Sequence, residues 1–286
     1  MPANRSHARA PRRGAYLLPS LFTVANIFCG YFALTESFKA GLLVAQDVAA
    51  AGTHFDMAAK AIGVAVLFDG MDGWIARQMG TSSAFGKELD SMADTITFGI
   101  APAFLAFSWG VQAVLTVPVT PLIENLTTAG WLISFLFVIC SVSRLARFNI
   151  QGAPASSPAS RPVHRHFVGL PTPASAGLVA AIVHVNSGNP MSGWLWVPFW
   201  LLVLLATSLL MVSRWRYFSF KSIDLQKKRK FVVVIGAGGV VALIWFYSHV
   251  VLLVIAVSYL LSGALGKVRH LLRRDTAEAL AQKREV

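Results

Sequence analysis

Long apolar stretches alternate with short polar connections along almost the whole chain. About 20 apolar residues are enough for a helix to cross a bilayer, and eight stretches reach or approach that length. They fall near residues 17–38, 56–79, 92–116, 129–149, 168–186, 193–213, 231–247 and 249–266. This pattern predicts an all-α polytopic membrane protein with about eight transmembrane helices.

The last two stretches are separated only by a short break at residues 247–249. A single helix over residues 231–266 would greatly overshoot the thickness of a bilayer, so we predict a tight helical hairpin there. The predicted organisation is a basic N-terminal segment (1–16), a transmembrane domain (17–222), two further transmembrane helices (223–266) and a basic tail (267–286).

The basic residues occupy alternate connections of this eight-helix arrangement. Lys and Arg cluster in the first 13 residues, in 144–165, in 214–230 and after residue 266. Because positively charged connections stay in the cytosol, we expect both termini to be cytosolic. The sequence thus predicts a multi-pass protein of the cytoplasmic (inner) membrane.

Composition narrows the class of partner. Hydrophobic residues make up 55% of the chain and charged residues only 13%, which excludes a charge-rich soluble domain. The net charge of +12 could suggest nucleic-acid binding, but the charges are spread over several connections next to the membrane. Contact with anionic lipid headgroups explains that distribution better, so we expect membrane lipids and no nucleic acid as partners.

Four aspartates stand out because ionised groups are costly at membrane depth. Their spacing places two on one face of a first helix and two on one face of the next, with a polar turn at residues 80–83 between them. The cations Arg77 and Lys87 are too few to neutralise four carboxylates, whereas hard divalent ions bind oxygen ligands. The four residues are Asp69, Asp72, Asp90 and Asp94.

Small and basic residues on the same helix faces indicate which kind of ligand would bind together with these ions. Gly73 and Ala76 leave room for a ligand near the backbone, and Arg77 could bind phosphate oxygens through two hydrogen bonds. Two divalent ions, Mg²⁺ or Mn²⁺, with a diphosphate ligand at the cytosolic end of these helices, are therefore predicted. For any single aspartate, the alternative is a structural role as a helix cap or in an internal ion pair. For the whole protein, the alternative function is that of a secondary transporter or proton pump.

These residues also form a recognisable motif. DGMDGWIAR, eight further residues and GKELDSMAD match DxxDGxxARx8GxxxDxxxD at every defined position, so the chain resembles the CDP-alcohol phosphotransferase family. The resemblance implies a core six-helix bundle in residues 17–222, often homodimeric, with the four aspartates holding two divalent metals and Asp94 also acting as the base. It implies that the CDP-linked lipid contacts Gly73, Ala76, Arg77, Ser83, Gly86, Thr23 and Asn26. The first helix departs from the family, which often has Pro-Asn-x-x-Thr where this chain has PSLFT at residues 19–23.

Within the family, several stretches are similar to the phosphatidylserine synthase branch. They are SRLARFNI, FVGLPTPA, LMVSRWRYFSFK and the start of the third span, where Ser91 replaces a proline typical of glycerol phosphate enzymes. This resemblance implies transfer of the phosphatidyl group of CDP-diacylglycerol to the hydroxyl of L-serine, with release of CMP. A sibling enzyme with another acceptor or an ether-lipid donor remains an alternative.

A serine acceptor needs a group that binds its carboxylate. Arg144, Arg147 and the neighbouring Asn149 are the candidates, because they lie at the predicted cytosolic end of the fourth span. The alternative is that both arginines only mark the cytosolic boundary or pair with lipid phosphates.

Overall fold

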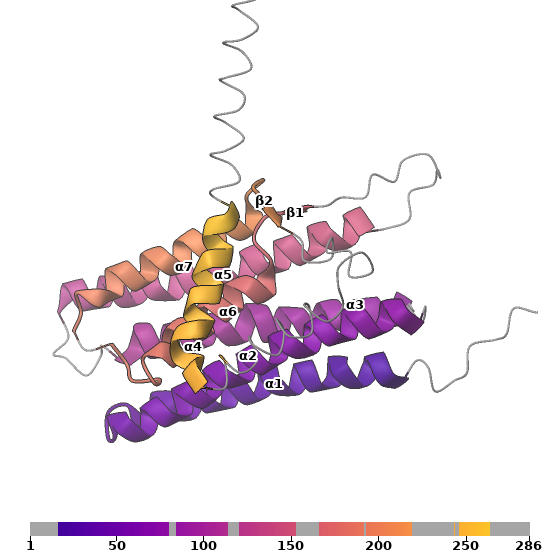
Figure 1. The fold of residues 1–286 in the computed structure, drawn as a ribbon. Coiled ribbons are helices and arrows are strands. Elements are labelled where there is room, and N and C mark those ends of the chain that lie inside the picture. Colours follow the sequence, from indigo (N-terminus) through magenta and orange to yellow (C-terminus); the bar gives the residue numbers. More distant parts are fainter. Residues whose placement is uncertain are drawn as a thin grey trace, which may run out of the picture.

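The structure is a computed structural model that describes residues 17–79, 84–113, 120–152, 166–191, 193–218, 243 and 246–263. Helices dominate the described residues, and most of them lie side by side in a bundle (Figure 1). In chain order the elements are α1 (Leu17–Leu43), α2 (Val48–Met79), α3 (Ala84–Asp94), the π-helix η2 (Thr95–Ile100), α4 (Ala101–Gly110), α5 (Pro121–Gly152), β1 (His166–Val168), α6 (Thr172–Val185), α7 (Trp196–Val212), β2 (Arg216–Phe218) and a helix over Phe246–Gly263, called here the 246–263 helix.

The first two long helices form an antiparallel hairpin. A short turn joins them, and Asp47 begins α2 because its Oδ1 accepts hydrogen bonds from the backbone N–H groups of Ala49 and Ala50, both at 3.0 Å. Alanines such as Ala33 and Ala58 are completely buried, and such small side chains let helix backbones approach closely. The hairpin packs on α4 and α6, which in turn contact α5 and α7 (Figure 1).

The chain from α3 to α4 is helical throughout but changes its hydrogen-bonding pattern in the middle. The π-helix η2 directly follows Asp94 and has Thr97, Phe98 and Gly99 buried. Thr97 Oγ1 donates to the carbonyl of Asn26 on α1 at 3.0 Å. At Gly30, one turn further along α1, an added Cβ would lie only 2.4 Å from Thr97 Oγ1, so α1 and η2 approach each other closely there.

A two-stranded antiparallel ribbon pairs β1, which precedes α6, with β2, which follows α7. Arg147 donates from Nη2 to the Val168 carbonyl (2.9 Å) and from Nη1 to the Val212 carbonyl (3.3 Å). Gly169 has a φ of +84° and faces the Met211 carbonyl, so there is no room for a side chain. The sequence pattern did not predict this three-residue ribbon, because each strand is too short to show a period-two alternation.

The helical membrane architecture predicted from the sequence is confirmed. Four described helices are long and apolar enough to cross a membrane, and the shorter α6 and α7 are apolar too. The four long apolar helices are Leu21–Leu43, Phe85–Gly110, Pro121–Ile150 and Phe246–Gly263. The long helix α2 is not among them and carries more charged residues than they do. The count of eight spans and the domain boundaries stay predictions.

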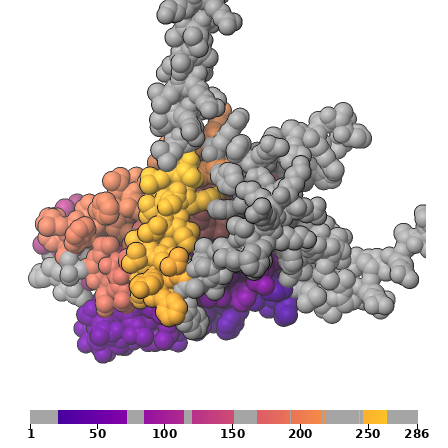
Figure 2. Space-filling model, in the orientation of Figure 1, coloured from indigo at the N-terminus to yellow at the C-terminus, as the bar shows by residue number. Residues whose placement is uncertain are grey.

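The position of one predicted break is wrong, while the helical hairpin over residues 231–266 stays a prediction. Residues 247–249 belong to the 246–263 helix, so the chain does not turn at the short polar break there. The break misled because Ser248 and His249 are not turn residues: they are helical, and both make hydrogen bonds to α6. The predicted span at 231–247 lies almost entirely outside the described residues. In Figures 1 and 2 the 246–263 helix, drawn in yellow, lies on the outside of the bundle.

Candidate active site

Three of the four aspartates meet at one end of the bundle. Asp69 comes from α2, and Asp90 and Asp94 come from α3, one helical turn apart. Each offers a carboxylate oxygen, and these oxygens all lie within 4.8 Å of one another. Asp69 and Asp90 are half-buried, while Asp94 is buried. The two acidic helix faces therefore converge, as the spacing of the aspartates suggested.

Asn26 on α1 forms the wall behind these carboxylates. Its side chain is only 1% exposed, and Nδ2 donates to Asp94 Oδ1 at 3.2 Å. Its own Oδ1 is buried and has no hydrogen-bond partner among the described residues. Thr23, one turn earlier on the same face, is buried as well. The predicted first-helix residues thus lie at the acidic cluster.

The donor atoms at this site fit a hard divalent cation. Every charged ligand atom in the cluster is a carboxylate oxygen, which is the atom type that Mg²⁺ and Mn²⁺ prefer. The unpartnered Asn26 Oδ1 adds a further oxygen acceptor on the wall. Three negative charges so close together would repel one another strongly unless cations reside nearby.

The remaining predicted ligands of the metals and of the CDP-linked lipid are only partly described. The last two turns of α2 carry Asp72, Gly73, Ala76 and Arg77, whose side chains lie outside the described part of the structure, as does the whole of Ser83. Gly86 lies on α3, one turn before Asp90, and is half-buried. Their roles stay predictions.

Arg144 is a predicted acceptor residue that interacts electrostatically with the acidic cluster. Its side chain is buried, and Nη1 lies 3.5 Å from Thr172 Oγ1 at the start of α6. Its guanidinium interacts electrostatically with Asp94 and Asp69. The Nε atom is buried without a hydrogen-bond partner among the described residues, so one donor of this cation is left for another group.

The other two predicted acceptor residues point elsewhere. Arg147 is engaged by the two backbone carbonyls of the ribbon described above. Asn149 Nδ2 donates to Ser91 Oγ at 2.8 Å, and Ser91 donates in turn to the Lys87 carbonyl at 3.0 Å. This pair ties the end of α5 to α3 beside Asp90. Both residues therefore fix the helices around the cluster.

Three site residues were missed by the sequence analysis. Thr97 and Gly30 set the distance between α1 and the helix that carries Asp94, and Thr172 contacts Arg144. A signal for Gly30 was present, because it lies four residues after Asn26 and so on the same helix face. Nothing in the local sequence of Thr97 marks a π-helix, which is a tertiary feature.

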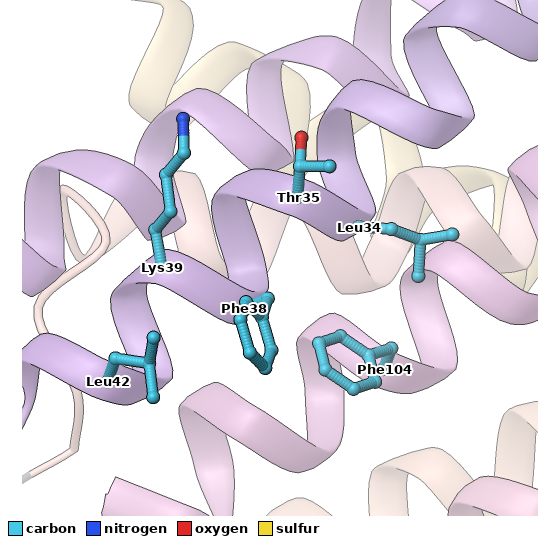
Figure 3. A pocket seen from close by; sticks show the side chains of 6 residues that line it. All are labelled: Leu34, Thr35, Phe38, Lys39, Leu42 and Phe104. Carbon is cyan, nitrogen blue, oxygen red and sulfur yellow. The ribbon is translucent and has the colours of Figure 1, made fainter.

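The structure also has an open apolar recess that is separate from the acidic cluster (Figure 3). It has a volume of about 560 Å³ and lies between α1 and α4. Its charged residue, Lys39, is paired with Glu36 at 2.7 Å. No acidic residue lines it, so it does not have the chemistry of a cation site. The lining residues are Leu34, Thr35, Phe38, Lys39, Leu42 and Phe104.

Fold and site together define a class of protein: a helical membrane protein with carboxylates gathered at one end of its bundle, in a form suited to divalent cations. Comparison with known proteins gives the family. The model of the CDP-alcohol phosphatidyltransferase family matches residues 16–189, and the chain belongs to this family. The match covers α1 to α6 and includes the whole acidic cluster, and the family resemblance predicted from the motif is confirmed.

Several curated relatives are similar over much of the chain. One is the CDP-diacylglycerol--serine O-phosphatidyltransferase of Helicobacter pylori, 35% identical over 79% of this chain and 81% of the relative. The enzyme of the same name from Mycobacterium tuberculosis is 34% identical over 71% of this chain, which spans 62% of that relative's length. An archaetidylserine synthase of Methanothermobacter thermautotrophicus is 29% identical over 70% of this chain and 69% of the relative.

Proposed function

We propose that this protein transfers the phosphatidyl group of CDP-diacylglycerol to the hydroxyl of L-serine, giving phosphatidylserine and CMP. The observation that carries the proposal is the convergence of Asp69, Asp90 and Asp94 beside the buried Arg144. It is supported by relatives that are named for this reaction and are 34–35% identical to the chain. Serine and CDP-diacylglycerol are the proposed substrates.

The carboxylates would have two tasks. Asp69, Asp72, Asp90 and Asp94 would hold two divalent cations, Mg²⁺ or Mn²⁺, which when bound supply positive charge against the diphosphate of the donor. Asp94 would also accept the proton of the serine hydroxyl, and the hydroxyl oxygen would then attack the lipid-linked phosphorus as CMP leaves. The hydrogen bond from Asn26 would orient the Asp94 carboxylate for this proton transfer.

The donor would be held by residues at the end of α2 and the start of α3. In this proposal Gly73, Ala76 and Gly86 leave space for the nucleotide, and Arg77 and Ser83 bind its phosphates, with Thr23 and Asn26 on the wall. The active site and both termini would face the cytosol of a cell whose inner membrane holds the protein. A homodimer is proposed from the resemblance, and light scattering in detergent tests it.

Arg144 is the proposed partner of the serine carboxylate. It is buried, interacts electrostatically with Asp94, and its Nε–H has no hydrogen-bond partner among the described residues, whereas Arg147 and Asn149 already bind groups of the protein. A charge-assisted hydrogen bond contributes about 1.5–3 kcal/mol, so Arg144→Ala should raise the KM for serine by roughly 10- to 150-fold while leaving binding of CDP-diacylglycerol intact. Arg147→Ala should instead lower the melting temperature. Unchanged serine dependence in both variants would reject this assignment.

The test of the function is CMP release by the purified protein from CDP-diacylglycerol, with Mg²⁺ or Mn²⁺. L-serine is compared with glycerol 3-phosphate, inositol phosphate and choline. We expect release that depends on serine and is abolished by Asp94→Asn. Asp47→Asn is the matched control, because asparagine caps a helix as well as aspartate does and Asp47 begins α2 at its far end. Release with another acceptor only would contradict the serine assignment.

An ether-lipid donor is a second candidate, because one relative is named archaetidylserine synthase. The acidic cluster would act in the same way on either donor, since the phosphates and the leaving CMP are identical. The same assay with a CDP-linked diether lipid distinguishes the two. Faster CMP release from the diether than from the diacyl donor, with serine present, would favour this candidate.

A further inference from the structure

A second polar cluster lies far from the acidic site. Asp56 on α2 is 13 residues before Asp69, which corresponds to about 20 Å along a helix. His184 lies near the end of α6, whose other end carries Thr172 beside Arg144. Ser248 belongs to the 246–263 helix. Three segments that are distant in sequence therefore bring an acid, an imidazole and a hydroxyl together at the opposite end of the bundle.

These three side chains form one hydrogen-bonded chain. His184 Nδ1 lies 2.5 Å from Asp56 Oδ1, and His184 Nε2 lies 3.0 Å from Ser248 Oγ. Each ring nitrogen thus has a different partner, with the carboxylate on one side and the hydroxyl on the other. This is the order of groups by which a base activates a nucleophile and a third group orients the base.

Neighbouring groups hold this arrangement in place. Lys60 Nζ pairs with the other carboxylate oxygen of Asp56 at 2.6 Å, which favours the ionised acid. His249 stacks on His184 with ring centroids 4.1 Å apart, and its Nδ1 lies 2.7 Å from the His184 carbonyl. The imidazole of His184 is almost completely buried, so its rotation is restricted and its tautomer is set by Asp56.

The hydroxyl, unlike the imidazole, is within reach of the surroundings. Ser248 is half-buried, and the side chains around it on the helix, Phe246, Tyr247 and Val250, are exposed. The 246–263 helix lies on the outside of the molecule (Figure 2). An apolar molecule beside this helix can therefore approach Ser248, and the acidic site is about 20 Å away along α2.

We propose that Ser248 is a nucleophilic serine, activated by His184 and Asp56, that accepts acyl groups from carboxylic esters with apolar chains. In this step the Ser248 O–H bond breaks and its proton moves to His184 Nε2, while Oγ forms a bond to the ester carbonyl carbon. The C–O bond to the alcohol then breaks, and the alcohol leaves with the proton from His184. Water hydrolyses the acyl-serine by the same route, releasing a carboxylic acid.

The full-length protein in detergent, treated with an alkyl fluorophosphonate, provides the test. Attack by an activated serine breaks the P–F bond, forms an Oγ–P bond and releases fluoride, so peptide mass mapping locates the reacting residue. EDTA is present throughout, so that the result is independent of the proposed phosphatidyl transfer. We expect the label on Ser248, no label there in Ser248→Ala, and labelling at least about tenfold slower in Asp56→Asn, because the loss of the orienting acid impairs the base.

The matched control is Ser262→Ala in the same helix, whose hydroxyl donates to the Tyr259 carbonyl at 2.6 Å; its labelling should equal that of the unmodified protein. A peptide map with no label on Ser248, or with equal labelling of Asp56→Asn, would overturn the proposal and leave the cluster a structural tie between helices. If melting-temperature measurements show that Asp56→Asn does not fold, hydrolysis of a p-nitrophenyl ester by Ser248→Ala is measured instead. Loss of ester turnover in Ser248→Ala supports the proposal, and unchanged turnover rejects it.

Discussion

The close approach of α1 to the π-helix makes Gly30 a sensitive position for the active site. In Gly30→Ala the new Cβ would lie 2.4 Å from Thr97 Oγ1 and 2.9 Å from Thr97 Cα. Carbon atoms in contact need about 3.5 Å, and the second neighbour is backbone, so the two helices must separate by about 0.5–1 Å. Asn26, one turn away, would move with α1, so its hydrogen bond to Asp94 would lengthen or break.

Two costs follow from this separation. Overpacking in a well-packed interior costs about 1–3 kcal/mol of stability, and a displacement of about 1 Å at a catalytic group can lower the rate on the order of a hundredfold. We therefore expect Gly30→Ala to fold with a lower melting temperature. Its kcat/KM for CMP release should be about 10- to 100-fold lower than that of the unmodified protein.

The assay is kcat/KM for CMP release, with the melting temperature measured on the same preparation. Gly63→Ala on α2 is the matched control, because no atom lies within 4 Å of its added Cβ and alanine is favoured over glycine in a helix by about 1 kcal/mol. It should be as active as the unmodified protein and at least as stable. A folded Gly30→Ala protein with activity within about twofold of the control would refute the idea that this contact positions the carboxylate.

Two further predictions concern the acidic site, and a third concerns the ribbon. Asn26→Ala should lower kcat by about 10- to 150-fold, since a hydrogen bond to a charged group is lost, whereas Asn186→Ala, which loses only an exposed bond at the far end of α6, should not change CMP release. Chelation by EDTA should abolish CMP release, and Mg²⁺ or Mn²⁺ should restore it to the unmodified protein but not to Asp94→Asn. Gly169→Ala should lower the melting temperature more than Gly193→Ala does, because both have positive φ but only Gly169 also faces a carbonyl oxygen at 2.3 Å; equal melting temperatures would reject that steric reason.

Much of the acidic site could be predicted because its information is local. Asp69, Asp90 and Asp94 recur at helical spacing around a polar turn, so periodicity alone brings their helix faces together. The contact of Asn26 with Asp94 could be predicted in part, because a polar residue inside an apolar span needs a partner. The fold class followed from the lengths of the apolar stretches in the same way.

The features that could not be predicted depend on tertiary packing. The π-helix lies where α1 approaches the chain closely at Gly30, and the ribbon lies where Arg147 donates to two carbonyls of other elements. Ser248 and His249 resemble a polar break in the sequence, yet they are helical because His184 lies opposite them. A polar residue in an apolar stretch signals either a turn or a buried partner, and the sequence alone does not distinguish the two.

The π-helix between Asp94 and α4 also has a consequence for how this protein tolerates insertions and deletions. A π-helix bonds residue i to i+5 and so accommodates one residue more than an α-helix would over the same span. Deleting one residue from Thr95–Ile100 would let the segment relax to a regular helix over the same span, so α4 should keep its orientation relative to the carboxylates. This segment should therefore tolerate the loss of one residue better than the regular helices on either side of it, where a one-residue deletion rotates everything that follows by about 100°.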